Sequence, residues 1–259
     1  MKPRTIAASL LLWMGMTAVA VAQNPFAGTW KQDLADSHLA GATIKFRPAA
    51  GDSIELDSDG TAYSFRTDGK AYRMTSGELA IWSQENPTTW TTSYRNLDGK
   101  PLSTGTWTLS GDGTHLNMIA SGTLPDGESY SNSTTYERSG GTAGLLGSWK
   151  STDVTLSTPE EMIIEANGLG GLSIKIPTTK FSFLGAFDGK EVSPTGPDIP
   201  PTLTMAIERS GPSSFRVIKR LNGIVTYSSV YTVSADRKTM TEIGNASGDP
   251  SHTMIWEKQ

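Results

Sequence analysis

Hydrophobic and polar residues alternate along most of the chain, as in β-strands that bury one face. In residues 90–94, aromatic Trp90 and Tyr94 alternate with small polar residues, and Trp107 and Leu109 share one face of the following run. Two later runs place alternate residues on one side: Leu172, Ile174 and Ile176, and Val225, Tyr227, Ser229, Tyr231 and Val233. This pattern predicts half-buried antiparallel strands.

Turn signals separate these runs. Asp98-Gly99, Asp112-Gly113, Asp126-Gly127 and Asn222-Gly223 are typical of tight hairpins, in which both central residues need positive φ. The runs recur at about 8–12 residues, which is the spacing of an antiparallel sandwich or barrel. Residues 32–40 and 158–165 are the two segments in which we expect a short helical turn. The prediction is an all-β protein.

Four motifs occur twice and in the same order. The two copies of each motif are separated by about 118 to 124 residues: Gly28-Thr29-Trp30-Lys31 with Gly147-Ser148-Trp149-Lys150, Tyr63-Ser64-Phe65 with Phe181-Ser182-Phe183, the hairpin at 108–116 with that at 232–240, and Tyr136-Glu137-Arg138 with Trp256-Glu257-Lys258. We therefore divide the chain into repeats at 26–139 and 145–259. Residues 139–144 are small and glycine-rich, which is typical of a flexible linker.

Each repeat has room for about eight to ten strands, so the chain is predicted to form two tandem antiparallel β-barrels. In the alternative arrangement, edge strands of the two repeats pair into one continuous sheet assembly. Failure of residues 145–259 to fold alone would count against independent barrels.

The N-terminus has the organisation of a secretory signal peptide. Lys2 and Arg4 precede an uncharged stretch at 6–22 that ends in small residues, with Ala20 and Ala22 at the positions expected before a cleavage site. An uncleaved anchor is the alternative, but a span normally needs about 20 apolar residues. We predict cleavage after Ala22 and a secreted or periplasmic protein without stable membrane insertion.

Charge and cysteine content exclude several classes of function. The net charge is −4, and removal of the two basic residues in 1–22 makes it −6. Nucleic-acid binding is not expected because such proteins carry a basic surplus. The chain has no cysteine, which excludes disulfides and thiolate ligands.

The repeated motifs resemble those of the lipocalin and calycin barrels. The resemblance rests on Gly28-Thr29-Trp30 and Gly147-Ser148-Trp149 near the start of each repeat, and on Arg138 and Lys258 at its end. It implies that the basic residue of the last strand packs over Trp30 or Trp149 and closes one end of a barrel. More closely, the chain resembles secreted bacterial proteins built from one or two lipocalin-like modules, although each repeat is shorter than a typical lipocalin.

Aromatic residues are the largest chemical feature of both repeats. Small barrels hold a single apolar ligand or are filled by their own side chains, and both interpretations stay open. On the first interpretation, the ligand-binding candidates are Trp82, Trp90, Tyr94, Trp107, Phe181, Phe183, Phe215 and Tyr227.

No motif for catalysis or for a cofactor is present. His38, His115 and His252 lack the spacing of metal ligands. The adjacent Glu160 and Glu161 are expected to be solvated, with an acid/base pair as the alternative. The leading hypothesis is a non-enzymatic protein that binds a small apolar ligand. Nothing in the sequence identifies a protein partner. One alternative is an envelope or extracellular interaction module with filled barrels. Another is a barrel isomerase or hydrolase, which would need buried ionisable groups facing one cavity.

Overall fold

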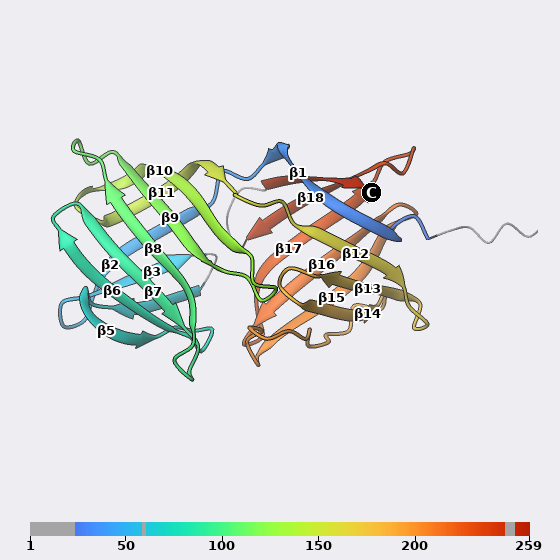
Figure 1. Ribbon diagram of the computed structural model, residues 1–259, viewed down its shortest axis with the longest axis horizontal. Helices are drawn as coiled ribbons and strands as arrows, with labels where there is room; N and C mark the ends of the chain where they lie inside the picture. The colour runs from blue at the N-terminus through green and yellow to red at the C-terminus, as the bar shows by residue number, and fades with distance from the viewer. Residues whose placement is uncertain (1–23, 59–60, 247–251) are drawn as a thin grey trace, which may run out of the picture.

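The computed structural model describes residues 24–58, 61–246 and 252–259, so the signal-peptide prediction for 1–22 lies outside the described residues. These residues form strands, turns and loops, and no helix occurs among them. The chain folds into two nearly closed antiparallel barrels that lie side by side (Figure 1). The all-β prediction with two tandem barrels is thereby confirmed.

Barrel 1 has ten strands that are contiguous in the sequence. In spatial order they are β4 (Thr61–Phe65), β3 (Ser53–Ser58), β2 (Thr43–Ala49), β11 (Leu146–Thr155), β10 (Ser129–Ala143), β9 (His115–Thr123), β8 (Pro101–Leu109), β7 (Thr89–Arg95), β6 (Leu79–Asn86) and β5 (Asp68–Arg73).

Barrel 2 has nine strands and takes its members from both ends of the chain. Its order is β14 (Phe181–Ala186), β13 (Gly171–Ile176), β12 (Glu161–Ala166), β1 (Gly28–His38), β19 (His252–Lys258), β18 (Thr239–Ala246), β17 (Ile224–Val233), β16 (Ser214–Leu221) and β15 (Leu203–Gly211). The loop between β14 and β15 helps to close it, since Val192 and Met205 exchange backbone hydrogen bonds of 2.8 and 2.9 Å.

The first strands of the two repeats are exchanged. β1 pairs with β12 and β19, and in Figure 1 its blue ribbon lies among the yellow and red strands of barrel 2. β11, the first strand of the second repeat, pairs with β10 and β2 in barrel 1. The repeats predicted at 26–139 and 145–259 therefore do not coincide with the two barrels.

The segment predicted as a linker, 139–144, explains the exchange. Residues up to Ala143 continue β10, and a two-residue turn at Gly144 and Leu145 leads directly into β11. Gly144 has φ of +56°, which suits a sharp reversal. Because the chain turns back at once, β11 must lie beside β10, in the position that β1 would take in an unexchanged barrel.

The four turns were confirmed as connections between strands, whereas the two expected helical turns are absent from the described residues. All four turn signals join consecutive strands, but only Asn222-Gly223 has positive φ at both residues. At the three Asp-Gly turns the glycine alone has positive φ, as in longer hairpin loops. Residues 32–38 belong to β1 and not to a helical turn, because Gln32 and Asp33 continue the pairing with β19 before a bulge. Residues 158–160 form a loop, and β12 begins at Glu161.

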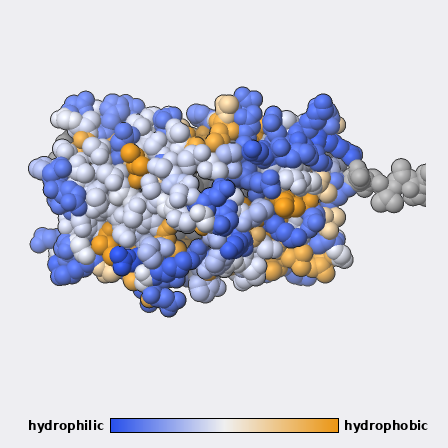
Figure 2. Space-filling view, viewed as in Figure 1, coloured by the Kyte–Doolittle hydropathy of each residue, from blue (hydrophilic) through white to orange (hydrophobic). Residues whose placement is uncertain are grey.

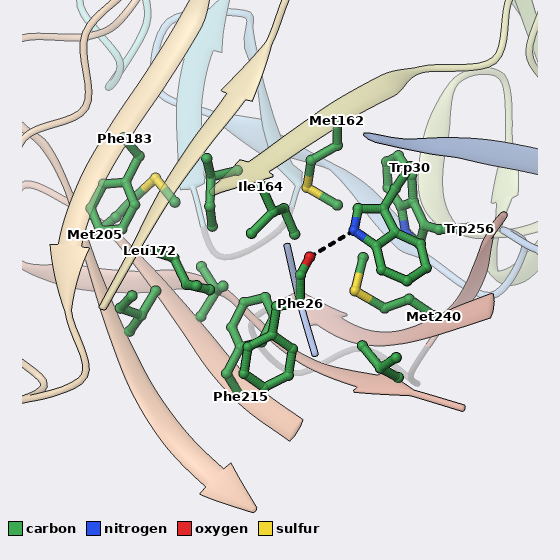
Figure 3. Packing of buried hydrophobic residues seen from close by; sticks show 14 residues of the cluster. Phe26, Trp30, Met162, Ile164, Leu172, Phe183, Met205, Phe215, Met240 and Trp256 are labelled. Atoms are coloured by element: carbon green, nitrogen blue, oxygen red, sulfur yellow. Dashed lines mark hydrogen bonds between the residues drawn. The ribbon is translucent and has the colours of Figure 1, made fainter. Parts of the chain in front are cut away.

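Each barrel has its own apolar core built around one indole of a first strand. Trp30 and Trp149 are fully buried, and their Nε1 groups donate to the carbonyls of Phe26 and Leu145 at 2.8 and 2.9 Å. Figure 3 shows Trp30 in barrel 2, with its hydrogen bond to Phe26 and with Met162, Met240 and Trp256 around it. The indoles thus fill one end of each barrel without leaving a buried donor unpaired.

Candidate functional site

One end of each barrel is closed by a cation over the buried indole. The guanidinium of Arg138 lies 4.0 Å from the ring centroid of Trp149 and donates to the carbonyls of Gly113, Leu146 and Gly144 at 2.7 to 2.8 Å. The Nζ of Lys258 lies 5.1 Å from the ring of Trp30. The lipocalin-like cation–indole pairs are present, but each pair joins the two repeats because the first strands are exchanged.

The opposite ends of the barrels face each other across the junction. The ammonium of Lys100 lies 3.7 Å from the carboxylate of Asp198, and the backbone amide of Asp126 donates to the carbonyl of Thr178 at 3.3 Å. Asn222 also donates through Nδ2 to the carbonyl of Thr75, at 3.2 Å. Loops from both barrels therefore hold the two open ends against one another.

A cavity lies at the open end of each barrel. The cavity of barrel 1 has about 400 Å³ and is completed by Leu221 of barrel 2. The cavity of barrel 2 has about 420 Å³ and is completed by Leu124, Tyr130 and other residues of barrel 1. Both volumes fall within the range of small-molecule sites, and both walls are mainly apolar.

Equivalent positions of the two repeats line the two cavities. Five pairs are each separated by 118 residues: Ile44 and Met162, Leu56 and Ile174, Ser58 and Ile176, Thr61 and Thr179, and Tyr63 and Phe181. Trp107 and Tyr231 form a sixth pair. The cavity is therefore a property of the repeat, because the same strand positions build it in both barrels.

The aromatic residues named from the sequence separate into three groups. Tyr94 and Trp107 line the cavity of barrel 1, and Phe181 lines that of barrel 2. Tyr227 belongs to a polar cluster that is described below. The remaining four, Trp82, Trp90, Phe183 and Phe215, are buried in the packed cores and do not line either cavity.

Apart from Glu78, the polar side chains that line the cavity of barrel 1 are uncharged. Trp82 donates through Nε1 to the hydroxyl of Tyr63 at 3.0 Å, and Trp107 lies with its ring nearly parallel to that of Tyr136, at a centroid distance of 6.2 Å. Burial raises the pKa of the Tyr63 and Tyr94 hydroxyls above the usual value, so both stay protonated. Glu78, beside the mouth, is the charged residue that lines this cavity.

Barrel 2 contains a carboxylate that sequence reasoning missed. Glu242 is 2% exposed; its carboxylate accepts hydrogen bonds from the hydroxyl of Tyr227 at 2.8 Å and from Nε1 of Trp256 at 3.2 Å. The Tyr227 hydroxyl also lies 2.9 Å from Nε2 of His252. Lys219 lies over the ring of Tyr227, with Nζ 4.9 Å from the centroid. Glu242 lies two residues after Met240 in β18, so the two side chains share a face of the strand. This spacing was the available signal that Glu242 points inward.

Glu160 lies near this cluster and is half-buried, not solvated as predicted. Burial raises the pKa of its carboxyl, the charge of Lys219 opposes this shift, and that of Glu242 adds to it. Glu160 lines a groove of about 400 Å³ with Gln32 and Met254, and its backbone amide donates to Oε1 of Gln32 at 3.3 Å.

A test of the Glu160 environment follows from linkage. Because its pKa is higher in the folded state, the folded protein binds more protons than the unfolded chain, so this group's contribution to stability falls as pH rises from about 4.5 towards the raised pKa. Glu160→Gln is expected to remove this loss and to raise the melting temperature at pH 7 more than at pH 4. Thermal melts of the wild type, Glu160→Gln and the control Glu161→Gln between pH 4 and 8 measure it. Equal shifts at both pH values would contradict the assignment.

Comparisons with known proteins identify no relative. No protein-family model, curated protein or solved structure matches the chain. In the described part of the chain, no helix is long and apolar enough to cross a membrane. The same residues contain no group of three or more His, Asp or Glu side chains that could hold a metal ion.

Proposed function

We propose that this protein is an exported, lipocalin-like carrier that binds small apolar ligands in the two cavities at the facing ends of its barrels. The observation that carries the proposal is the lining of both cavities by equivalent positions of the two repeats, including the Ser58 and Ile176 pair. Barrels filled only by packing would not need a hollow at the same place twice. Export is inferred from the pattern of residues 1–22.

The buried carboxylate favours binding over catalysis as the role of barrel 2. A general acid or base must reach a reacting group in the cavity. Glu242 does not line that cavity, and each of its two oxygens already accepts a hydrogen bond, from Tyr227 and Trp256 respectively. The cluster therefore has the form of a structural network that shapes the cavity wall.

The outer surface offers less support for an interaction module. Figure 2 shows apolar side chains on the visible face only as small separate groups among polar ones. Exposed residues such as Ile119 and Leu184 are single β-sheet positions of the kind that soluble proteins commonly show.

Titration with N-phenyl-1-naphthylamine, a neutral fluorophore that brightens in apolar sites, tests the proposal. We expect two sites of micromolar affinity on the exported protein purified without detergent. Ser58→Trp and Ile176→Trp each place an indole in one cavity, so each variant is expected to lose one site. The outward-facing Ser64→Trp and Leu184→Trp are the matched controls, since they add the same side chain to neighbouring strands. Absence of binding by the folded wild type would refute the proposal, and equal loss in the controls would refute its location.

A further inference from the structure

Barrel 1 contains a buried hydrogen-bond donor without an acceptor. Within the described residues, Nε1 of Trp107 is buried and makes no hydrogen bond. The side chain is 6% exposed and lines the cavity. Oγ1 of Thr92, on the strand beside it, is likewise buried without a partner. Gly105 lies against both groups, because a Cβ there would clash with Oγ1 of Thr92 and lie 3.6 Å from Nε1 of Trp107. Buried indole N–H groups are normally paired, so this one requires an explanation.

The equivalent place in barrel 2 has an acceptor. Strand register aligns the two sites, because Trp107 lies opposite Met118 as Tyr231 lies opposite Glu242. In barrel 2, the Glu242 carboxylate accepts hydrogen bonds from the N–H of Trp256 and the O–H of Tyr227. In barrel 1, the corresponding Met118 offers only a thioether, which is a weak acceptor. In barrel 1 the residue opposite Trp107 is therefore a thioether, where barrel 2 has a carboxylate opposite Tyr231.

We propose that the ligand of barrel 1 supplies this acceptor: an uncharged molecule with a flat apolar body and a carbonyl or ether oxygen that accepts the N–H of Trp107. This inference rests on the proposed function and names the chemical class that the cavity selects. The flat body follows from the aromatic wall, where Trp107 and Tyr136 lie with nearly parallel rings. The apolar side chains of Ile44, Leu56 and Met118 line the rest of the cavity.

The charges around the cavity exclude an anionic head group. No Lys or Arg lines the cavity of barrel 1 among the described residues, whereas Lys219 lines that of barrel 2. A carboxylate ligand in barrel 1 would be desolvated without a counter-ion, with Glu78 at the mouth adding repulsion. A neutral oxygen carries no such cost and still satisfies the indole donor.

A matched pair of probes tests the acceptor directly. The probes 2-acetylnaphthalene and 2-ethylnaphthalene have nearly the same shape, but only the first has a carbonyl. Their dissociation constants are measured on the full exported protein carrying Ile176→Trp, so that barrel 2 does not contribute. We expect the ketone to bind about tenfold more tightly, which is the usual range for one added hydrogen bond in a desolvated site. The ¹H–¹⁵N signal of the Trp107 indole should shift downfield with the ketone and not with the hydrocarbon.

Two variants separate the hydrogen bond from packing. Trp107→Phe removes the donor, and Met118→Gln supplies an amide oxygen from the position of Glu242. Each is expected to abolish the preference for the ketone while hydrocarbon binding stays within about threefold, with far-ultraviolet circular dichroism confirming that the fold is kept. Ser64→Trp, on an outward position, should keep the tenfold preference.

The outcomes distinguish the two proposals. Equal binding of the two probes would overturn the acceptor inference and leave the apolar carrier function standing. No binding of either probe, in the wild type as well as in Ile176→Trp, would overturn both. A preference that survives in Trp107→Phe would place the acceptor contact elsewhere and so refute the role given to Trp107.

Discussion

A disulfide is expected to form between cysteines introduced at Lys31 and Glu257, and none between cysteines at Lys31 and Glu137. In the exchanged arrangement Lys31 lies opposite Glu257 on β19, and Lys150 lies opposite Glu137 on β10. Directly opposite residues of antiparallel strands have Cα atoms about 4.5 to 5.5 Å apart, which is within the reach of a disulfide. All four positions are exposed, so cysteines there should not disturb packing.

The native chain has no cysteine, so each double variant reports on a single contact. Oxidation is followed by the loss of two thiols and by mobility on a non-reducing gel. Lys150→Cys with Glu137→Cys is the positive control, because it crosses the two-residue hairpin between β10 and β11. Efficient cross-linking of Lys31→Cys with Glu137→Cys would show that β1 lies in the barrel of its own repeat, and the exchange would be wrong.

Trp149→Ala is expected to destabilise barrel 1, and Trp30→Ala to destabilise barrel 2. Each substitution should lower the free energy of unfolding by about 3 to 5 kcal/mol. Both indoles are fully buried, and truncating a buried tryptophan leaves a large cavity. Trp149 lies opposite Ile44 in barrel 1 and under Arg138, whereas Trp30 lies opposite Met162 in barrel 2. The affected barrel is thus the opposite of the one that the position in the sequence suggests.

Native-state hydrogen exchange locates the loss. In Trp149→Ala, the amides of β2 and β10 should lose protection while those of β12 and β19 keep most of theirs, and Trp30→Ala should show the reverse. The two variants are controls for each other because the substitution and the depth of burial are the same. Loss of protection on β12 and β19 in Trp149→Ala would contradict the strand assignment.

The repeat motifs predicted the strands and the closed ends of the barrels, but not which first strand enters which barrel. Gly28-Thr29-Trp30-Lys31 and Gly147-Ser148-Trp149-Lys150 carry nearly the same side chains, so either strand satisfies either position. The decision comes from the connection at 139–144. Its glycines are typical of a flexible linker by composition, yet they continue a strand into a tight turn because β11 is available to pair with it.

The candidate site was predicted in part for a similar reason. Alternation indicates that Tyr94 and Trp107 point inward, but it does not distinguish inward residues that line a cavity from those packed in the core, such as Trp82 and Phe215. Glu242 was not among the residues named from the sequence, although it shares a face with the buried Met240.

The exchange of first strands also sets an order in which the chain can fold. β1 reaches its neighbours on β19 only after the rest of the chain is available, since the contact between Gln32 and Met254 spans 222 residues. Closing such a loop is entropically expensive and makes the final step slow. Until β11 emerges, the place beside β10 and β2 is vacant and β1 is the strand that matches it. If β1 pairs there first, the native fold is completed only when β11 replaces it, so the repeat that gives both barrels their shape also supplies a competitor for one strand position.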